Sequence, residues 1–168
     1  EKNNLARLRE PPAARKAAML ADYAMATEYY ERFIVAFPED VHAAEKSFMM
    51  GEAFSEIGEY GKAIAAYERA AYDFGINLFS EDAAYSAVMA YRKQIEAETD
   101  EWQRNELMRK RLETQLLFVD NFSFSPYAKP VLFDSIDMLY NEKDYERVVD
   151  QAGRFFELKP EGTNKEKL

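Results

Sequence analysis

The segment from Ala44 to Ala70, AEKSFMMGEAFSEIGEYGKAIAAYERA, decides the fold that this sequence predicts. Apolar residues recur at helical spacing in each half of it: Met50, Phe54 and Ile57 in the first, and Ala63, Tyr67 and Ala70 in the second. Gly58 lies between the two halves, where a helix end favours a residue that tolerates positive φ. The segment therefore predicts a hairpin of two amphipathic helices.

A repeat distance of 37 residues indicates that this hairpin is one of several. Small residues at Gly51 and Ala63 let paired helices approach closely, and aromatic side chains fill the space beside them. Counting back 37 residues from Tyr60, Ala63, Tyr67, Ala70 and Gly75 leads to Tyr23, Ala26, Tyr30, Phe33 and Pro38. Counting forward from Ala53 and Phe54 leads to Ala90 and Tyr91. So many agreements at one offset favour a helical-repeat protein.

The last repeat follows a longer step of 48 residues, which separates Ala70 from Phe118, and the step from Phe118 to Phe155 is again 37. The 11 extra residues must lie between Tyr91 and Arg111. Eleven residues are close to three helical turns, so the insertion can lengthen one hairpin without changing its phase. Apolar stripes continue across the polar Glu96–Glu101 corner at Ile95, Trp102, Met108, Leu112, Leu116 and Val119.

These patterns predict an all-α fold in one repeat domain at residues 11–160. Helices are expected near 12–20, 22–36, 43–57, 60–73, 80–98, 101–121, 127–141 and 144–157. They group into repeats near 11–38, 43–75, 80–123 and 127–160. Residues 1–10 are a polar segment and residues 161–168 a frayed tail. The chain starts at Glu1 and neither end reads as a polar capping helix, so we expect it to belong to a longer protein.

The hairpin at residues 43–75 resembles the tetratricopeptide repeat. The residues that carry the resemblance are Gly51, Phe54, Gly58, Tyr60, Ala63, Tyr67, Ala70 and Gly75. The chain departs from the family pattern at Ser47, where the first helix usually has an aromatic residue. The resemblance implies a right-handed α-solenoid of about four helical hairpins, the third extended by the 11-residue insertion. It also implies a scaffold that binds a protein or peptide and has no enzymatic activity.

A narrower resemblance concerns residues 20–73 and 112–158. The loops that begin at Phe37-Pro38 and Ser125-Pro126 look like those of bacterial envelope members of the family. Such members include the barrel-assembly lipoprotein of the outer membrane and the periplasmic coordinator of the Tol–Pal system. The resemblance favours a periplasmic or outer-membrane-associated location, although the lipobox cysteine of the lipoproteins is absent from this sequence.

Family members bind peptides on the inner face that the first helices of successive repeats form. Carried over to this sequence, that face comprises Phe48, Glu52, Ser55, Tyr85, Met89, Arg92, Lys93, Phe133, Asp137 and Tyr140. Arg92 and Lys93 would form a basic spot for a carboxylate. Members that clamp a chaperone tail need Lys and Asn where Phe48 and Glu52 stand, which argues against that ligand. The alternative is that several of these aromatic residues pack against the neighbouring repeat.

The sequence offers little for catalysis, cofactor binding or metal binding. His42 is its only histidine, and it lies in an expected loop without a nucleophile nearby. The glycines form no phosphate-binding loop. The acidic corner at Glu96, Glu98, Asp100 and Glu101 lacks the spacing and glycine of a calcium loop. We therefore expect no catalytic residue, no cofactor and no metal.

The net charge of −9 favours a basic or mixed-charge protein partner and disfavours nucleic acid, which binds clustered Lys and Arg. No apolar run approaches the ~20 residues of a membrane span. Three hypotheses follow: an interaction scaffold, a self-associating or regulatory repeat domain of a larger envelope protein or enzyme, and a glycan or small-molecule binder in the bacterial envelope.

Overall fold

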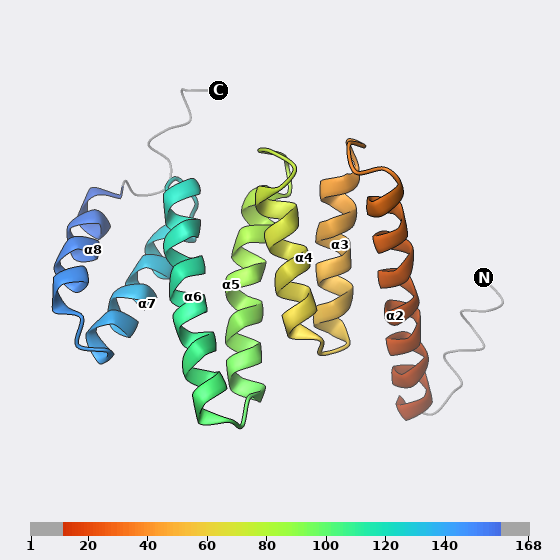
Figure 1. Cartoon of the computed structure of the whole chain (residues 1–168), viewed down its shortest axis with the longest axis horizontal. Coiled ribbons are helices and arrows are strands. Elements are labelled where there is room, and N and C mark those ends of the chain that lie inside the picture. The colour runs from red at the N-terminus through yellow and green to blue at the C-terminus, as the bar shows by residue number, and fades with distance from the viewer. Residues whose placement is uncertain (1–11, 159–168) are drawn as a thin grey trace. The chain divides into compact units, whose positions relative to one another are not determined.

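The computed structural model describes residues 12–158, and these residues confirm the all-α prediction (Figure 1). They contain seven helices and no strand. The helices are α2 (Pro12–Ala36), α3 (Ala43–Glu56), α4 (Tyr60–Tyr72), α5 (Ser80–Ala97), α6 (Glu101–Asn121), α7 (Ala128–Asn141) and α8 (Tyr145–Glu157). The predicted polar segment 1–10 and tail 161–168 lie outside the described residues.

The chain divides into two compact units, Glu1–Ser80 and Glu81–Leu168. In the first unit α3 packs against both α2 and α4, and in the second α7 packs against both α6 and α8. Tyr85 of α5 contacts Phe118 of α6 with ring centroids 6.0 Å apart. Consecutive helices therefore pack on one another in each unit, as helical-repeat proteins require.

The repeat register predicted from the sequence is visible in the backbone of three loops. In each, a side-chain oxygen accepts a hydrogen bond from the backbone N–H two residues later, over 2.8–3.1 Å: Asp40 to His42, Asn77 to Phe79 and Ser125 to Tyr127. In each, the carbonyl of that same residue also accepts from the N–H three residues later. The loops are separated by steps of 37 and 48 residues, so the short and long steps are both confirmed.

The turns inside the hairpins repeat as well. After α3, Glu59 N–H bonds to Phe54 C=O and Gly58 N–H to Ser55 C=O. After α7, the same two bonds are made from Asp144 to Leu139 and from Lys143 to Tyr140. This pair of bonds ends a helix on a residue with positive φ. Gly58 has φ 82° and Lys143 has φ 63°, so a lysine adopts the conformation that the glycine adopts in the earlier repeat.

The 11-residue insertion lengthens the hairpin of α5 and α6, as predicted. These helices have 18 and 21 residues, whereas α7 and α8 have 14 and 13. Leu112 and Val119 of α6 are buried, but Trp102 in its first turn is 72% exposed, so the apolar stripe does not continue as a buried face. At about 1.5 Å per residue, α6 is roughly 10 Å longer than α7.

One predicted boundary is wrong: α2 runs without a break from Pro12 to Ala36, where two helices meeting near residue 21 were expected. No glycine or proline occurs between residues 13 and 36, and alanine is frequent there, so nothing interrupts the helix. The first predicted repeat, 11–38, is therefore a single helix in the described residues. Among the helices that follow it, α3 packs against α4 and α7 packs against α8.

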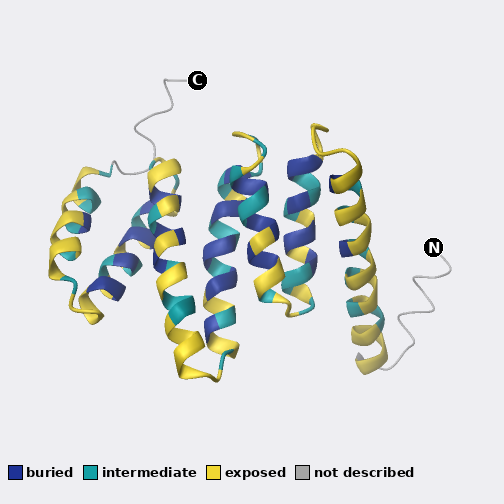
Figure 2. Cartoon of the chain, in the orientation of Figure 1, coloured by how far each residue is buried: buried dark blue, intermediate teal, exposed yellow. Residues whose placement is uncertain are grey.

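Each unit has its own core, and the buried residues line the inner sides of the helices (Figure 2). Ile34, Met50 and Ala66 form one cluster, and Leu112, Met138 and Leu139 form another. Ser47, which stands where the family has an aromatic residue, is fully buried and its hydroxyl donates to Ala66 C=O over 2.9 Å. The buried hydroxyl is thus satisfied by the backbone of α4.

Gly51 confirms the prediction that small residues allow close helix packing. A Cβ at this position would lie 2.5–2.9 Å from three ring carbons of Tyr67 on α4. No larger residue fits unless that ring moves, because real Cβ contacts are not this short. Gly51 thus places the aromatic ring of Tyr67 directly on the backbone of α3.

Candidate functional site

A trough between α2 and α3 contains two of the ten predicted inner-face residues, Phe48 and Glu52. It encloses about 500 Å³. The residues lining it are Asp22, Tyr23, Ala26 and Tyr30 from α2, and Phe48, Met49, Glu52 and Ala53 from α3. The lining is aromatic and aliphatic apart from two carboxylates, and it includes no Lys or Arg. We call this surface the α2–α3 trough.

Contacts behind the trough fix Phe48 and Glu52 in place. The ring of Phe48 lies 5.8 Å from that of Tyr67 and 5.7 Å from that of Phe79, centroid to centroid. Glu52 Oε1 accepts a hydrogen bond from the Tyr67 hydroxyl over 2.5 Å. Burial and then the carboxylate of Glu52 raise the pKa of Tyr67 far above its ordinary value, so the phenol remains a donor. Glu52 is thereby held as an oriented, exposed acceptor.

Ser55, one turn further along α3, is half-buried and does not line the trough. Its hydrogen bond to Tyr67 lowers the pKa of the phenol, whereas burial and Glu52 raise it. Ser55 therefore supports the packing of Tyr67 and is not part of this candidate surface.

The predicted residues on α5 divide between packing and solvent. Tyr85 is stacked on Tyr127 with centroids 4.0 Å apart, so for this residue the packing alternative holds. Met89 is half-buried. Arg92 and Lys93 are exposed, and Arg92 Nε lies 3.2 Å from a Glu96 carboxylate oxygen. The expected basic spot is thus partly neutralised on its own helix.

The predicted residues on α7 are exposed at its edge with α8. Phe133 is 62% and Tyr140 is 59% exposed. Phe133 contacts Phe155 at 6.2 Å, and Tyr140 meets Tyr145 edge-on at 5.8 Å. Asp137 is exposed on the same helix. These residues and those on α5 belong to the second unit, whereas Phe48 and Glu52 lie together in the α2–α3 trough.

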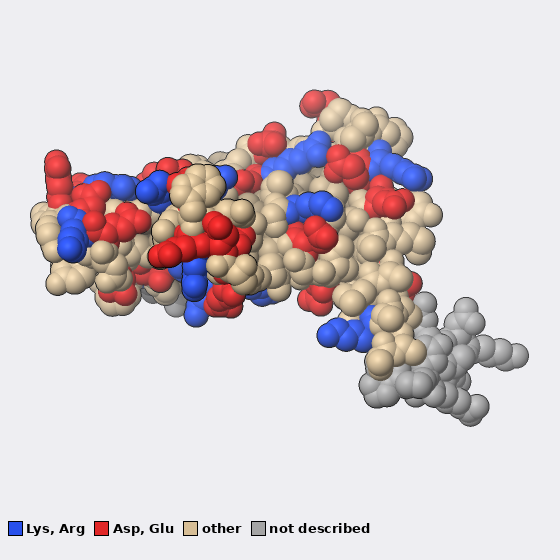
Figure 3. Space-filling model, turned by 60° about the horizontal axis from the view of Figure 1, so that its bottom comes forward, with Lys and Arg blue, Asp and Glu red and all other residues tan. Residues whose placement is uncertain are grey.

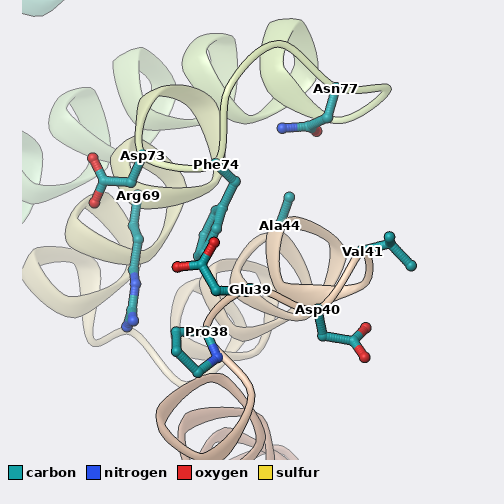
Figure 4. Close-up of a pocket in the computed structure, with 9 residues that line it drawn as sticks. All are labelled: Pro38, Glu39, Asp40, Val41, Ala44, Arg69, Asp73, Phe74 and Asn77. Atoms are coloured by element: carbon teal, nitrogen blue, oxygen red, sulfur yellow. The ribbon is translucent and has the colours of Figure 1, made fainter.

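A second hollow, which the sequence analysis missed, lies at one end of the first unit (Figure 4). It encloses about 530 Å³ between the α2–α3 loop and the segment that follows α4. The residues lining it are Pro38, Glu39, Asp40, Val41, Ala44, Arg69, Asp73, Phe74 and Asn77. Val41 and Leu78 are 37 residues apart and occupy equivalent positions in the two loops, so the repeat distance could have predicted that their side chains are related.

Arg69 is the only cation in the lining of this second hollow. Its guanidinium lies 5.7 Å from the Phe74 ring centroid and 3.9 Å from a Glu31 carboxylate oxygen. Glu39, Asp40 and Asp73 therefore leave the hollow with an excess of negative charge. In the view of Figure 3, the acidic and basic side chains of the described residues are intermingled.

His42 and the carboxylates of the acidic corner make hydrogen bonds with residues close to them in the sequence. His42 Nδ1 lies 3.1 Å from Glu45, whose pKa is lowered by its hydrogen bond to Lys46 and then by that to His42. At the acidic corner, Glu98 accepts two backbone N–H bonds and Asp100 caps α6. Within residues 12–158 no three metal-ligating side chains come together.

None of the helices in that range is both long and apolar enough to cross a membrane. Comparison with known families and proteins assigns no relative: no protein-family model matches the sequence, and no curated protein matches it.

Proposed function

We propose that this chain is a protein-interaction module that binds a peptide segment of a partner in the α2–α3 trough. In this proposal the described helices belong to a right-handed solenoid of tetratricopeptide type, with no chemistry of its own. The observation that carries the proposal is the trough itself, a hollow of about 500 Å³ with an aromatic lining and two carboxylates.

The lining specifies the chemistry of the partner. Tyr23, Tyr30 and Phe48 are half-buried, so each presents part of a ring that a bound apolar side chain would cover. Ring faces also attract cations, by about 0.5–2 kcal/mol each. Asp22 and Glu52 add two negative charges with no basic residue in the lining. The best ligand is therefore a segment that places an apolar side chain beside Lys or Arg.

The net charge of −9 acts in the same direction over longer distances. An acidic surface steers a basic ligand and raises its association rate, and salt weakens that effect. We therefore expect association to slow as salt rises.

The test begins with peptides selected from a random library on the immobilised chain. The proposal predicts that selected peptides combine apolar residues with Lys or Arg. The double variant Asp22→Asn/Glu52→Gln keeps the shape of the trough but removes its charge, and should weaken binding about tenfold, equivalent to 1.4 kcal/mol. Asp137→Asn on α7 is a matched control for the loss of an exposed carboxylate. If the parent chain, the double variant and Asp137→Asn bind the selected peptides with equal affinity, the binding site lies outside the trough.

Self-association is a second candidate, because α8 has an exposed apolar stripe. Tyr145, Val149 and Phe156 are exposed and recur at helical spacing. An exposed apolar stripe marks an interaction site. Molar mass measured by light scattering at two well-separated concentrations tests it, with Val149→Glu/Phe156→Glu as the disrupting variant. A mass that stays monomeric at both concentrations rules this candidate out.

A further inference from the structure

Two loops of the first unit display large apolar side chains to solvent. The loops are residues 37–42, between α2 and α3, and residues 73–79, after α4, and they lie at the same end of the unit (Figure 1). Val41 is 88% exposed, Ile76 99% and Leu78 93%, and Phe37 is also exposed. We call these four residues, with the hollow between the two loops, the loop-end surface.

These loops do not need their apolar side chains to keep their shape. Asp40 and Asn77 each close a turn by accepting a backbone N–H bond from two residues later. The amide of Asn77 also donates to Ala70 C=O and Gly75 C=O, over 3.3 and 2.9 Å. Polar residues would satisfy the same turns. The loop-end surface is thus an ordered display of side chains that contribute little to folding, which is the character of a docking site.

The charges in the hollow select the occupant. Glu39, Asp40 and Asp73 line it together with one cation, Arg69, which lies within 3.9 Å of Glu31. A second copy of this chain would bring the same carboxylates and a net charge of −9. An anionic lipid surface would be repelled for the same reason. A protein segment with both apolar and basic side chains fits both components of the surface.

We propose that the loop-end surface docks a partner-protein segment in which apolar side chains are flanked by Lys or Arg. The apolar side chains cover Val41, Ile76 and Leu78, and a cation occupies the hollow beside Glu39 and Asp73. This surface shares no residue with the α2–α3 trough, so it is a second contact point that does not depend on the proposed function of the trough.

Two variants separate the components of the surface. Val41→Ser/Ile76→Ser/Leu78→Ser removes the apolar part, and Glu39→Gln/Asp73→Asn removes charge while leaving the turn residues Asp40 and Asn77 intact. All five side chains are in exposed positions, so both variants should keep the circular dichroism spectrum and thermal midpoint of the parent chain. A variant that loses its fold is replaced by its single substitutions.

The probe is a synthetic amphipathic helical peptide of Leu and Lys, with a Leu and Glu peptide of the same pattern as its control. Calorimetry gives the affinity, and methyl NMR of Val41, Ile76 and Leu78 locates the contact. We expect the Leu–Lys peptide to shift these methyl signals and to bind at least tenfold more weakly to either variant. The Leu–Glu peptide should not bind.

Other results overturn the inference. Unchanged affinity in both variants does so, as does equal binding of the Leu–Glu peptide. Dimerisation of the parent chain that the triple serine variant abolishes would assign the surface to a second copy. Binding to phosphatidylserine vesicles lost in that variant would assign it to membrane. If only Asp22→Asn/Glu52→Gln weakens binding of the Leu–Lys peptide, the peptide binds in the trough and the loop-end proposal is wrong. If only the two loop-end variants weaken it, the peptide binds at the loop-end surface and the trough proposal is wrong.

Discussion

The close approach of α3 and α4 at Gly51 leads to a prediction about Gly51→Ala. In an open helix this substitution would stabilise the protein by about 0.8–1.0 kcal/mol, because alanine is the better helix former. Here the new methyl would lie 2.5–2.9 Å from three ring carbons of Tyr67. That ring is buried, contacts Phe48 and donates a hydrogen bond to Glu52, so it cannot move freely.

The magnitude follows from three effects. Overpacking a core costs about 1–3 kcal/mol. Displacing Tyr67 from Glu52 costs a further 0.5–1.5 kcal/mol or so. The gain in helix propensity offsets only part of this, so the first unit should lose roughly 2 kcal/mol of unfolding free energy.

Urea denaturation followed by circular dichroism measures this free energy. Gly153→Ala on α8 is the matched control, because a Cβ there meets no atom within 4 Å. It should gain up to about 1 kcal/mol. In a Tyr67→Ala background, Gly51→Ala should likewise become stabilising, because the obstructing ring is gone. If Gly51→Ala stabilises the parent chain as much as Gly153→Ala does, the close packing at Gly51 is refuted.

Three further predictions concern single side chains. Lys143 has φ 63°, a conformation that costs an L-residue about 1–2 kcal/mol. Lys143→Gly should therefore raise the free energy of unfolding, measured by urea titration, by up to about 1 kcal/mol. A lower free energy of unfolding in this variant would contradict the strain assigned to Lys143. The raised pKa of Tyr67 stabilises the fold fully below its unfolded value of about 10, and that contribution is lost as pH rises above it. Tyr67→Phe should therefore show a shallower alkaline loss of stability between pH ~10 and ~12 than the parent, and parallel pH curves would refute this. Asp134 accepts from both Arg111 and Gln115, so Asp134→Ala should lower the thermal midpoint of the second unit by the equivalent of about 1.5–3 kcal/mol, more than Asp137→Ala.

Much of the fold could be predicted from the sequence, because turn residues and apolar spacing act over short stretches of the chain. Turn residues and apolar spacing recur at fixed distances, and Asp40, Asn77 and Ser125 form the same turn in three loops. The insertion keeps helical phase, so the register survives it. The boundary predicted near residue 21 is wrong, because no glycine or proline lies there to end the helix.

The candidate surfaces could be predicted only in part. Phe48 and Glu52 were expected on an inner face, and they do lie in a trough. Tyr23 and Tyr30, which form the opposite wall of the trough, were predicted only as repeat positions and not as part of a binding surface. Spacing assigns a residue to one face of a helix but does not say how far a neighbouring helix covers that face.

The sequence by itself determined the helices from residue 43 onward, their repeat register and the glycine between α3 and α4, because these depend on residues close together along the chain. Tertiary structure alone decided that Tyr85 stacks on Tyr127 and that Trp102 remains exposed. It also decided that Ile76 and Leu78 remain in solvent. Burial depends on the length and position of the element that packs opposite, and that element lies far along the chain from the residue it covers.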